Sequence, residues 1–281
     1  MTKIQVTCPS CQKKGLIDVS EEILKNITRG LLAVNVPDII CEHTFIVYVD
    51  KNLAIRDYFM ADFKIELPQI SVPEGITEKK IPSKEVVNLD LIKLNVPAIL
   101  LTYVLKCIFS KKEAIIIMES SFLNEHVLNF FKFITQDSFE IKIKLLSKEE
   151  YKNNKKNYKD YIVFEGNEII NDSDKIIDIK KLKVEKHLVQ VFLAESDLSY
   201  SYIVFKNEIH KAYNLAKSIL ERVNQENQKK INFKYIVDLI VEKFNIKLEK
   251  MYLDFIVEIL KNYFGLEITE ASDVGDFLGF I

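Results

Sequence analysis

Residues 3–19 read KIQVTCPSCQKKGLIDV, and residues 39–49 read IICEHTFIVYV. Apolar and polar residues alternate over short runs in the first stretch, which is typical of strands with one buried face. A further apolar run at 30–36 and a hairpin turn at 50–52 predict that the β-structure continues. We therefore expect residues 1–67 to form a small β module.

The cysteines of this module are paired at the spacing of metal ligands. Cys8 and Cys11 are separated by a Pro-Ser pair that favours a tight turn, and one residue separates Cys41 from His43. One intervening residue in an extended chain places two side chains on the same face of a strand. Zinc binds thiolates and imidazole in a tetrahedron, and four protein ligands leave no position for a substrate. The sequence predicts a structural Zn²⁺ site formed by Cys8, Cys11, Cys41 and His43.

The cysteines also allow a different interpretation. A disulfide between Cys8 and Cys11 would join the first pair, although nothing in the sequence indicates the oxidising compartment that disulfides need. The fourth cysteine, Cys107, lies in an apolar run, so we expect it in a hydrophobic core and not at the metal.

Strands that carry two metal-binding turns resemble a zinc ribbon, and this resemblance covers residues 1–67 alone. It departs from the commonest ribbon pattern, because the second pair is Cys41-x-His43 and not another Cys-x2-Cys. The chain as a whole is similar to uncharacterised archaeal proteins that begin with a CPxC motif. That resemblance implies zinc and a cytoplasmic location, and it implies no activity.

The 281 residues carry a formal net charge of -2, with 48% hydrophobic and 28% charged residues. This composition is typical of a soluble globular protein and gives no global attraction to nucleic acid or to an anionic membrane. The longest apolar stretch, at 96–105, is shorter than the roughly 20 residues that a membrane-spanning helix needs. Because the first residues are polar and belong to the β module, we expect no signal peptide and a cytoplasmic protein.

A proline-rich stretch at 68–84 is the predicted linker, and residues 85–225 after it predict an alternation of helices and strands. The expected order is helix 94–109, strand 114–118, helix 120–135, solvated segment 148–159 between strands 139–145 and 161–164, and helices 184–194 and 203–225. This order favours an α/β domain with a partly parallel sheet.

Residues 226–281 predict a helical C-terminal unit. Two amphipathic helices at 233–244 and 248–264 are joined by a tight turn, and a short strand at 266–269 follows. Helix, turn, helix and strand resemble a winged-helix unit in outline. The acidic tail ends in apolar residues, which either dock on a partner or fold back on the core. The expected fold class is a multidomain α+β or α/β protein with three parts.

The sequence contains none of the catalytic motifs for which we searched. A phosphate-binding loop needs glycines, but the turn at 119–122, after the strand predicted at 114–118, reads ESSF. His126, His187 and His210 each have a carboxylate nearby in sequence, but neighbouring residues on a helix point in different directions. We therefore expect no catalytic residues, no organic cofactor and no enzymatic activity.

A basic segment, Lys142–Lys159, has two interpretations. It holds seven lysines and two acids, with Tyr151 and Tyr158 between them. Basic residues interleaved with aromatic residues can bind a nucleic-acid backbone. The alternative is a solvated loop beside an edge strand whose lysines prevent aggregation.

These observations favour a non-enzymatic, zinc-containing adaptor or regulatory protein that acts through protein–protein contacts. The alternative is a nucleic-acid-binding factor, related to transcription or RNA, that uses the zinc ribbon and Lys142–Lys159. The second C-terminal helix carries Glu249, Asp254 and Glu258 and no arginine, whereas a helix that reads a DNA groove needs basic side chains. We therefore expect a protein partner, with nucleic acid as the alternative.

Overall fold

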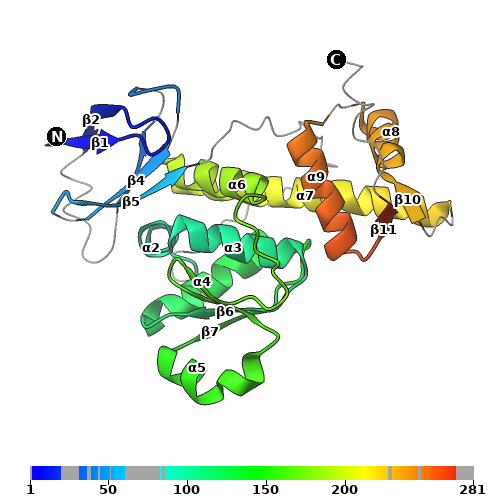
Figure 1. Cartoon of the computed structure of the whole chain (residues 1–281), viewed down its shortest axis with the longest axis horizontal. Helices are drawn as coiled ribbons and strands as arrows, with labels where there is room; N and C mark the ends of the chain where they lie inside the picture. Colours follow the sequence, from blue (N-terminus) through cyan, green and yellow to red (C-terminus); the bar gives the residue numbers. More distant parts are fainter. Residues whose placement is uncertain are drawn as a thin grey trace.

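Figure 1 shows the fold of the chain in a computed structural model. The structure describes residues 2–19, 32–36, 39–43, 45–50, 52–60, 83, 86–226, 230–245 and 248–269. The predicted linker at 68–84, apart from Ser83, and the tail from residue 270 lie outside these residues. In the described parts, small β-sheets form the N-terminal module, a mixed sheet with helices forms the centre, and helices dominate the C-terminal part.

Two small antiparallel sheets form the N-terminal module. The first sheet pairs β1 (Thr2–Thr7) with β2 (Lys14–Val19). The second sheet has the order β3 (Leu32–Val36), β4 (Phe45–Val49) and β5 (Ile55–Met60). The strands lie where the apolar runs of the sequence predicted them.

β4 is the central strand of the module, and all five of its residues are buried. Alternate residues of a strand point to opposite faces. Phe45, Val47 and Val49 belong to the apolar cluster shared with the β1–β2 sheet, whereas Ile46 and Tyr48 belong to the core of the helical part. A strand covered on both faces needs no polar alternation, which explains the continuous apolar run FIVYV.

The central sheet has the order β7-β6-β8-β9. Its strands are β6 (Ala114–Ile117), β7 (Ile143–Leu146), β8 (Ile162–Glu165) and β9 (Glu168–Asn171). β6 runs parallel to both β7 and β8, and β9 pairs antiparallel with β8, so the sheet is partly parallel as predicted. Both faces are covered, because Ile116 and Phe164 pack into the main core while Ile115 and Val163 pack with Tyr151 on the other side.

The apolar run predicted as one helix at 94–109 forms two helices. α2 (Leu89–Asn95) ends before Pro97, α3 (Ala98–Phe109) begins after it, and the two helices are bent by 109°. Proline has no N–H to donate and its ring clashes with the preceding turn, so it starts a helix better than it continues one. α3 is buried along nearly its whole length. Among the described helices, none alone is long and apolar enough to cross a membrane, and only α2 and α3 together reach that length and composition.

The segment between α4 (Ser121–Ile134) and β8 differs from the prediction in two ways. The strand expected at 139–145 begins only at Ile143, because Phe139 packs instead among the aromatic rings of the core. Residues 148–159 are mostly exposed, as expected, but they also form α5 (Lys148–Asn154) and the 3₁₀ helix η1 (Lys155–Tyr158), which were not predicted.

A long helix joins the parts of the molecule. α7 (Leu198–Gln225) has 28 residues and runs along the long dimension of the structure in Figure 1. It starts earlier than the predicted residue 203, because the Asp197 carboxylate accepts a hydrogen bond from the Tyr200 N–H at 2.9 Å and caps the helix. α6 (Lys183–Ala194) contacts α3 and α7, and it also contacts the second sheet of the N-terminal module.

The C-terminal helix pair is α8 (Phe233–Phe244) and α9 (Lys250–Asn262), as predicted. β10 (Lys230–Asn232) and β11 (Glu267–Thr269) lie beside them and pair in the parallel sense. Asn245 ends α8 in the left-handed conformation. α9 packs against α7 and α6, and seven of its residues are buried.

Candidate metal centre

The first cysteine pair lies in the turn between β1 and β2. The N–H of Cys8 donates to the carbonyl oxygen of Lys13 at 2.8 Å, and the N–H of Gln12 donates to the carbonyl oxygen of Cys8 at 2.9 Å. Gln12 adopts a positive φ of 60°, which lets the chain reverse within a few residues. This compact turn presents the side chains of Cys8 and Cys11 on one side.

The second pair lies in the segment that leads into β4 and rests on the first turn. Gly15 in β2 makes this contact possible, because a Cβ atom at that position would lie 2.6 Å from Cγ1 of Ile40. Since such a distance is too short for two carbon atoms, glycine permits the close approach of the two segments. Cys41 and His43 follow Ile40 directly and are carried to the same place.

The four predicted ligands come together. The Sγ atoms of Cys8, Cys11 and Cys41 and a ring nitrogen of His43 all lie within 4.8 Å of one another. Cys8 is buried, Cys11 is exposed, and the other two are half-buried. All three cysteines are free thiols, so the structure contains no Cys8–Cys11 disulfide. Across the described part of the chain, this is the sole group of three or more Cys, His, Asp or Glu side chains placed to hold a metal ion.

The thiols of the group influence one another's protonation. Burial acts to raise the pKa of Cys8, but hydrogen bonds from the backbone at Cys11 and Ser10, and then from the neighbouring thiols, lower it overall. Burial, reinforced by the Cys8 and Cys11 thiols and opposed by a backbone hydrogen bond at His43, raises the pKa of Cys41 to about 11. Metal binding would require all three thiols to lose their protons, and a divalent cation would supply the positive charge that three thiolates need.

The imidazole of His43 provides an independent test of fit. Its Nδ1 atom is buried and makes no hydrogen bond to any described group. A buried ring nitrogen without a partner is costly, and metal coordination at the imidazole is one way to offset that cost. The residues present therefore suit a four-coordinate metal with sulfur and nitrogen ligands.

The hairpin behind the site is braced by a buried carboxylate. Asp50 accepts hydrogen bonds from the N–H groups of Asn52 and Ala54 and pairs with Arg56. The Ala54 and Arg56 contacts, against the opposing effect of burial, hold the pKa of Asp50 below its usual value. The sequence indicated this turn but not the ion pair.

The remaining histidines form no catalytic pair with the carboxylates near them in sequence. His126 Nδ1 lies 3.3 Å from the carbonyl oxygen of Val86. Burial lowers the pKa of both His187 and His210. The three residues lie on α4, α6 and α7, and no described contact joins any of them to Glu125, Glu185 or Glu208.

A buried charged cluster was not predicted from the sequence. Lys106 on α3 is 6% exposed; its Nζ forms an ion pair with Glu258 on α9 and lies 3.8 Å from Oε1 of Glu185 on α6. Burial, partly offset by Lys106, raises the pKa of Glu185 to about 7. This cluster joins three helices whose residues are far apart in the sequence, so spacing alone could not reveal it.

No family model, no curated protein and no solved structure matches the chain. The functional interpretation therefore rests on the geometry of its own residues.

Proposed function

We propose that the chain is a cytoplasmic, non-enzymatic adaptor or regulatory protein that contains a structural zinc ion and acts through protein–protein contacts. The observation that carries the proposal is the grouping of three thiols and one imidazole within 4.8 Å. Four protein ligands complete a tetrahedral zinc ion and leave no coordination position for a substrate. The metal would therefore hold the module together and would not carry out a reaction.

In this proposal the N-terminal module is zinc-ribbon-like. The ligands come from the turn after β1 and from the segment before β4, so one ion would join the two small sheets. A module of this size has a small core, and small domains commonly depend on such a link. Zinc suits three thiolates and an imidazole, whereas magnesium and calcium prefer oxygen ligands.

Exposed apolar side chains beside the metal site support a protein partner. Leu16 is 60% exposed and Ile39 is 71% exposed. They follow Gly15 and precede Ile40, the two residues that form the close contact between the segments of the site. Apolar side chains on ordered backbone, here the strand β2 for Leu16 and a turn for Ile39, can be buried by a partner at a small cost in conformational entropy. We therefore assign Leu16 and Ile39 to the partner-binding surface.

The C-terminal unit is winged-helix-like in the order of α8, α9 and β11. In DNA-binding members of that class the second helix of the pair enters the major groove. α9 instead packs on α7, and the N-cap residue that precedes it, Glu249, is exposed and acidic. These features favour a role for this unit in protein packing over DNA reading.

Elemental analysis of the purified protein tests the metal. We expect about one zinc ion per chain and loss of zinc in the Cys41→Ser variant. The matched control is Cys107→Ala, because Cys107 is buried in the main core away from the site, and this variant should retain zinc. Wild-type protein without zinc would contradict the proposal.

Cross-linking in cells that express the chain tests the partner surface. We expect one protein to cross-link reproducibly to the wild type and to be lost in the Leu16→Asn/Ile39→Asn variant, with its zinc retained. Phe122→Asn is the control, because Phe122 is 55% exposed on α4, outside the module. Equal capture by both variants would show that Leu16 and Ile39 do not bind the partner.

A second candidate function is nucleic-acid binding through the Lys142–Lys159 segment. The observation that favours it is a group of four exposed lysines at 152–159, on α5, on η1 and directly after η1.

A further inference from the structure

Four lysines lie close together, within eight residues, in the helical run formed by α5 and η1. Lys152 is on α5, Lys155 and Lys156 are on the 3₁₀ helix η1, and Lys159 follows η1 directly. All four are exposed, and we call them the lysine stripe: Lys152, Lys155, Lys156 and Lys159. In Figure 1 this run lies at the end of the molecule farthest from α7.

The stripe differs from the other lysines of the same segment, which have partners. Lys142 lies 3.6 Å from Glu113, and Lys148 pairs with Glu165. Lys144 donates to the hydroxyl of Tyr161 at 2.8 Å. Among the described residues, no acidic side chain lies within ion-pair distance of a stripe lysine. Four charges therefore remain available to an external anion.

The acids closest in sequence to the stripe form no ion pair with it. Glu150 is held by Ser147 in the capping box that starts α5. Glu149 and Asp160 are exposed and make no ion pair with the stripe within the described chain. The four ammonium groups are thus free of direct contact with these carboxylates.

The tyrosines of the segment serve the fold. Tyr151 is buried against Ile115 and Val163 of the central sheet, and its ring stacks on Tyr158 with 6.2 Å between the centroids. Tyr158 in turn packs edge-on against Tyr161 at 5.5 Å. Rings that are occupied in this way are not free to stack on bases. A nucleic acid would be contacted here through its phosphates.

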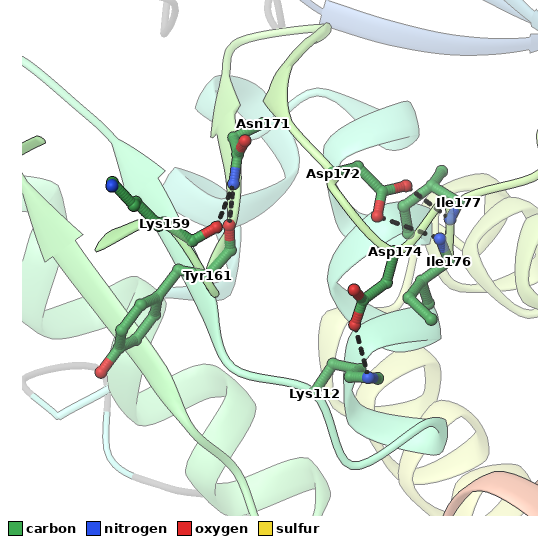
Figure 2. Close-up of polar contacts among 8 residues, drawn as sticks. All are labelled: Lys112, Lys159, Tyr161, Asn171, Asp172, Asp174, Ile176 and Ile177. Atoms are coloured by element: carbon green, nitrogen blue, oxygen red, sulfur yellow. Dashed lines mark hydrogen bonds and ion pairs between the residues drawn. The ribbon is translucent and has the colours of Figure 1, made fainter. Parts of the chain in front are cut away.

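The backbone under the stripe is fixed at both ends. The capping box holds the first turn, and the Asn171 side chain donates to the carbonyl oxygens of Lys159 at 3.0 Å and Tyr161 at 2.6 Å. Figure 2 shows these bonds, with the ammonium of Lys159 pointing away from them. An ordered row of charges binds an extended anion with less loss of conformational entropy than a flexible loop would.

The surroundings of the stripe favour nucleic acid over a membrane. The exposed neighbours between its lysines are Asn153, Asn154 and Asn157, and no large apolar side chain lies among them. A helix that binds a membrane surface inserts an apolar face beside its basic residues. The buried aromatic side chain of this segment, Tyr151, already packs on the central sheet and is not available to insert into a membrane.

We propose that the lysine stripe binds the phosphate backbone of nucleic acid, without base stacking and therefore without sequence preference. This inference rests on the second candidate function and assigns it a site and a mode of contact. Four lysines on phosphates predict a slope of about -3 to -4 for the logarithm of the association constant against the logarithm of salt concentration on duplex DNA. Single strands should bind with a slightly smaller slope of about -3.

The test is fluorescence anisotropy with a labelled duplex of mixed sequence, titrated at several salt concentrations. The stripe variant changes all four lysines to glutamine. The control variant makes the same change at four scattered, exposed lysines, so that both variants lose four positive charges: Lys3, Lys14, Lys180 and Lys234. Circular dichroism and zinc content establish that both variants are folded.

We expect the stripe variant to bind at least about tenfold more weakly at low salt, with a slope near zero, and the control to stay within about twofold of the wild type. Equal weakening of both variants would attribute binding to net charge and overturn the inference. Unchanged binding by the stripe variant would overturn it too, while leaving nucleic-acid binding to another surface. No binding by the wild type would reject both. Equal stripe-dependent binding to polyglutamate or anionic vesicles would overturn the assignment to nucleic acid.

Discussion

The N-terminal module and the helical body differ in the size of their apolar cores. Most buried apolar residues of the module form a small cluster of their own, whereas those of the body form one large cluster from α2 to α9 and a small one between α5 and the central sheet. A small core contributes little stability, and domains with such cores commonly rely on metals or other cross-links. We infer that the module depends on four side chains and the body on many apolar contacts.

The boundary between the two regions runs through one strand. β4 turns Phe45, Val47 and Val49 to the module and Ile46 and Tyr48 to the body. Loss of the metal should therefore spread to β4 and stop there, because its second face is held by an independent core. Stabilisation by a metal site and stabilisation by a large apolar core would thus meet within one strand, β4.

Metal removal should have the largest effect, and it tests whether the module and the body are stabilised independently. Structural zinc sites contribute about 10–16 kcal/mol of apparent binding free energy, which exceeds the stability of most small domains. A chelator should unfold β1 and β2 and leave α3 and α7 folded. Hydrogen exchange measures this as faster exchange at residues 2–19 and unchanged protection at 98–109. Added zinc should restore protection, and simultaneous loss in α3 would show that the two regions unfold as one.

Phe130→Ala tests how much the helical body depends on its apolar core. The Phe130 ring is fully buried, with its centroid 5.3 Å from Phe192 and 6.0 Å from Phe205. Removing a buried phenylalanine costs about 3–5 kcal/mol, since it leaves a cavity. Denaturant unfolding should show this loss for the body, with zinc content unchanged. The control Phe122→Ala, on the exposed side of α4, should change stability by about 0.5 kcal/mol or less.

The two regions also differ in how far their residues could be predicted. The four residues of the possible metal site could be named because each pair is close in sequence, and a thiolate set has one dominant chemistry. The strands of the module followed from apolar runs bounded by turns. The sequence signals that predict the module therefore come largely from residues close together in the chain.

The helical body contains features with no local signal. Lys106, Glu185 and Glu258 meet only through the packing of three helices. Other misses had a signal that was overlooked. Ser147 and Glu150 have the spacing of a capping box, which marks the start of α5, and Pro97 marks the break between α2 and α3.

Glu185→Gln tests whether a buried carboxyl group makes the stability of the helical body depend on pH. Burial, partly offset by Lys106, raises the pKa of Glu185 from 4.5 to about 7. Between these pH values the folded state keeps a proton that the unfolded state has released. Stability from this group is therefore complete below about pH 4.5 and is lost as pH rises towards 7.

The expected loss is about 3 kcal/mol, from about 1.4 kcal/mol per pH unit of pKa difference. Glutamine stays neutral, so the wild type should lose about that much stability relative to the Glu185→Gln variant between pH 5 and pH 8. Denaturant titrations at several pH values measure it. The difference between the two proteins is needed because the lowered pKa values of His187 and His210 act with the opposite sign. If the difference in unfolding free energy between the two proteins did not change with pH, the folded structure would not shift the ionisation of Glu185.

Asp197→Ala should have the smallest effect and tests whether the body tolerates local damage that the module would not. The Asp197 carboxylate accepts from the Tyr200 N–H at 2.9 Å at the start of α7, and loss of such a cap costs about 1 kcal/mol. Ser120 is the matched control, because it occupies the same position before α4 and makes no side-chain capping bond. Ser120→Ala should therefore be close to neutral in denaturant unfolding. Because α7 is held along its length by apolar contacts, zinc content should not change in either variant. Loss of zinc in Asp197→Ala would mean that α7 transmits strain to the module, and the two regions would then share one stability.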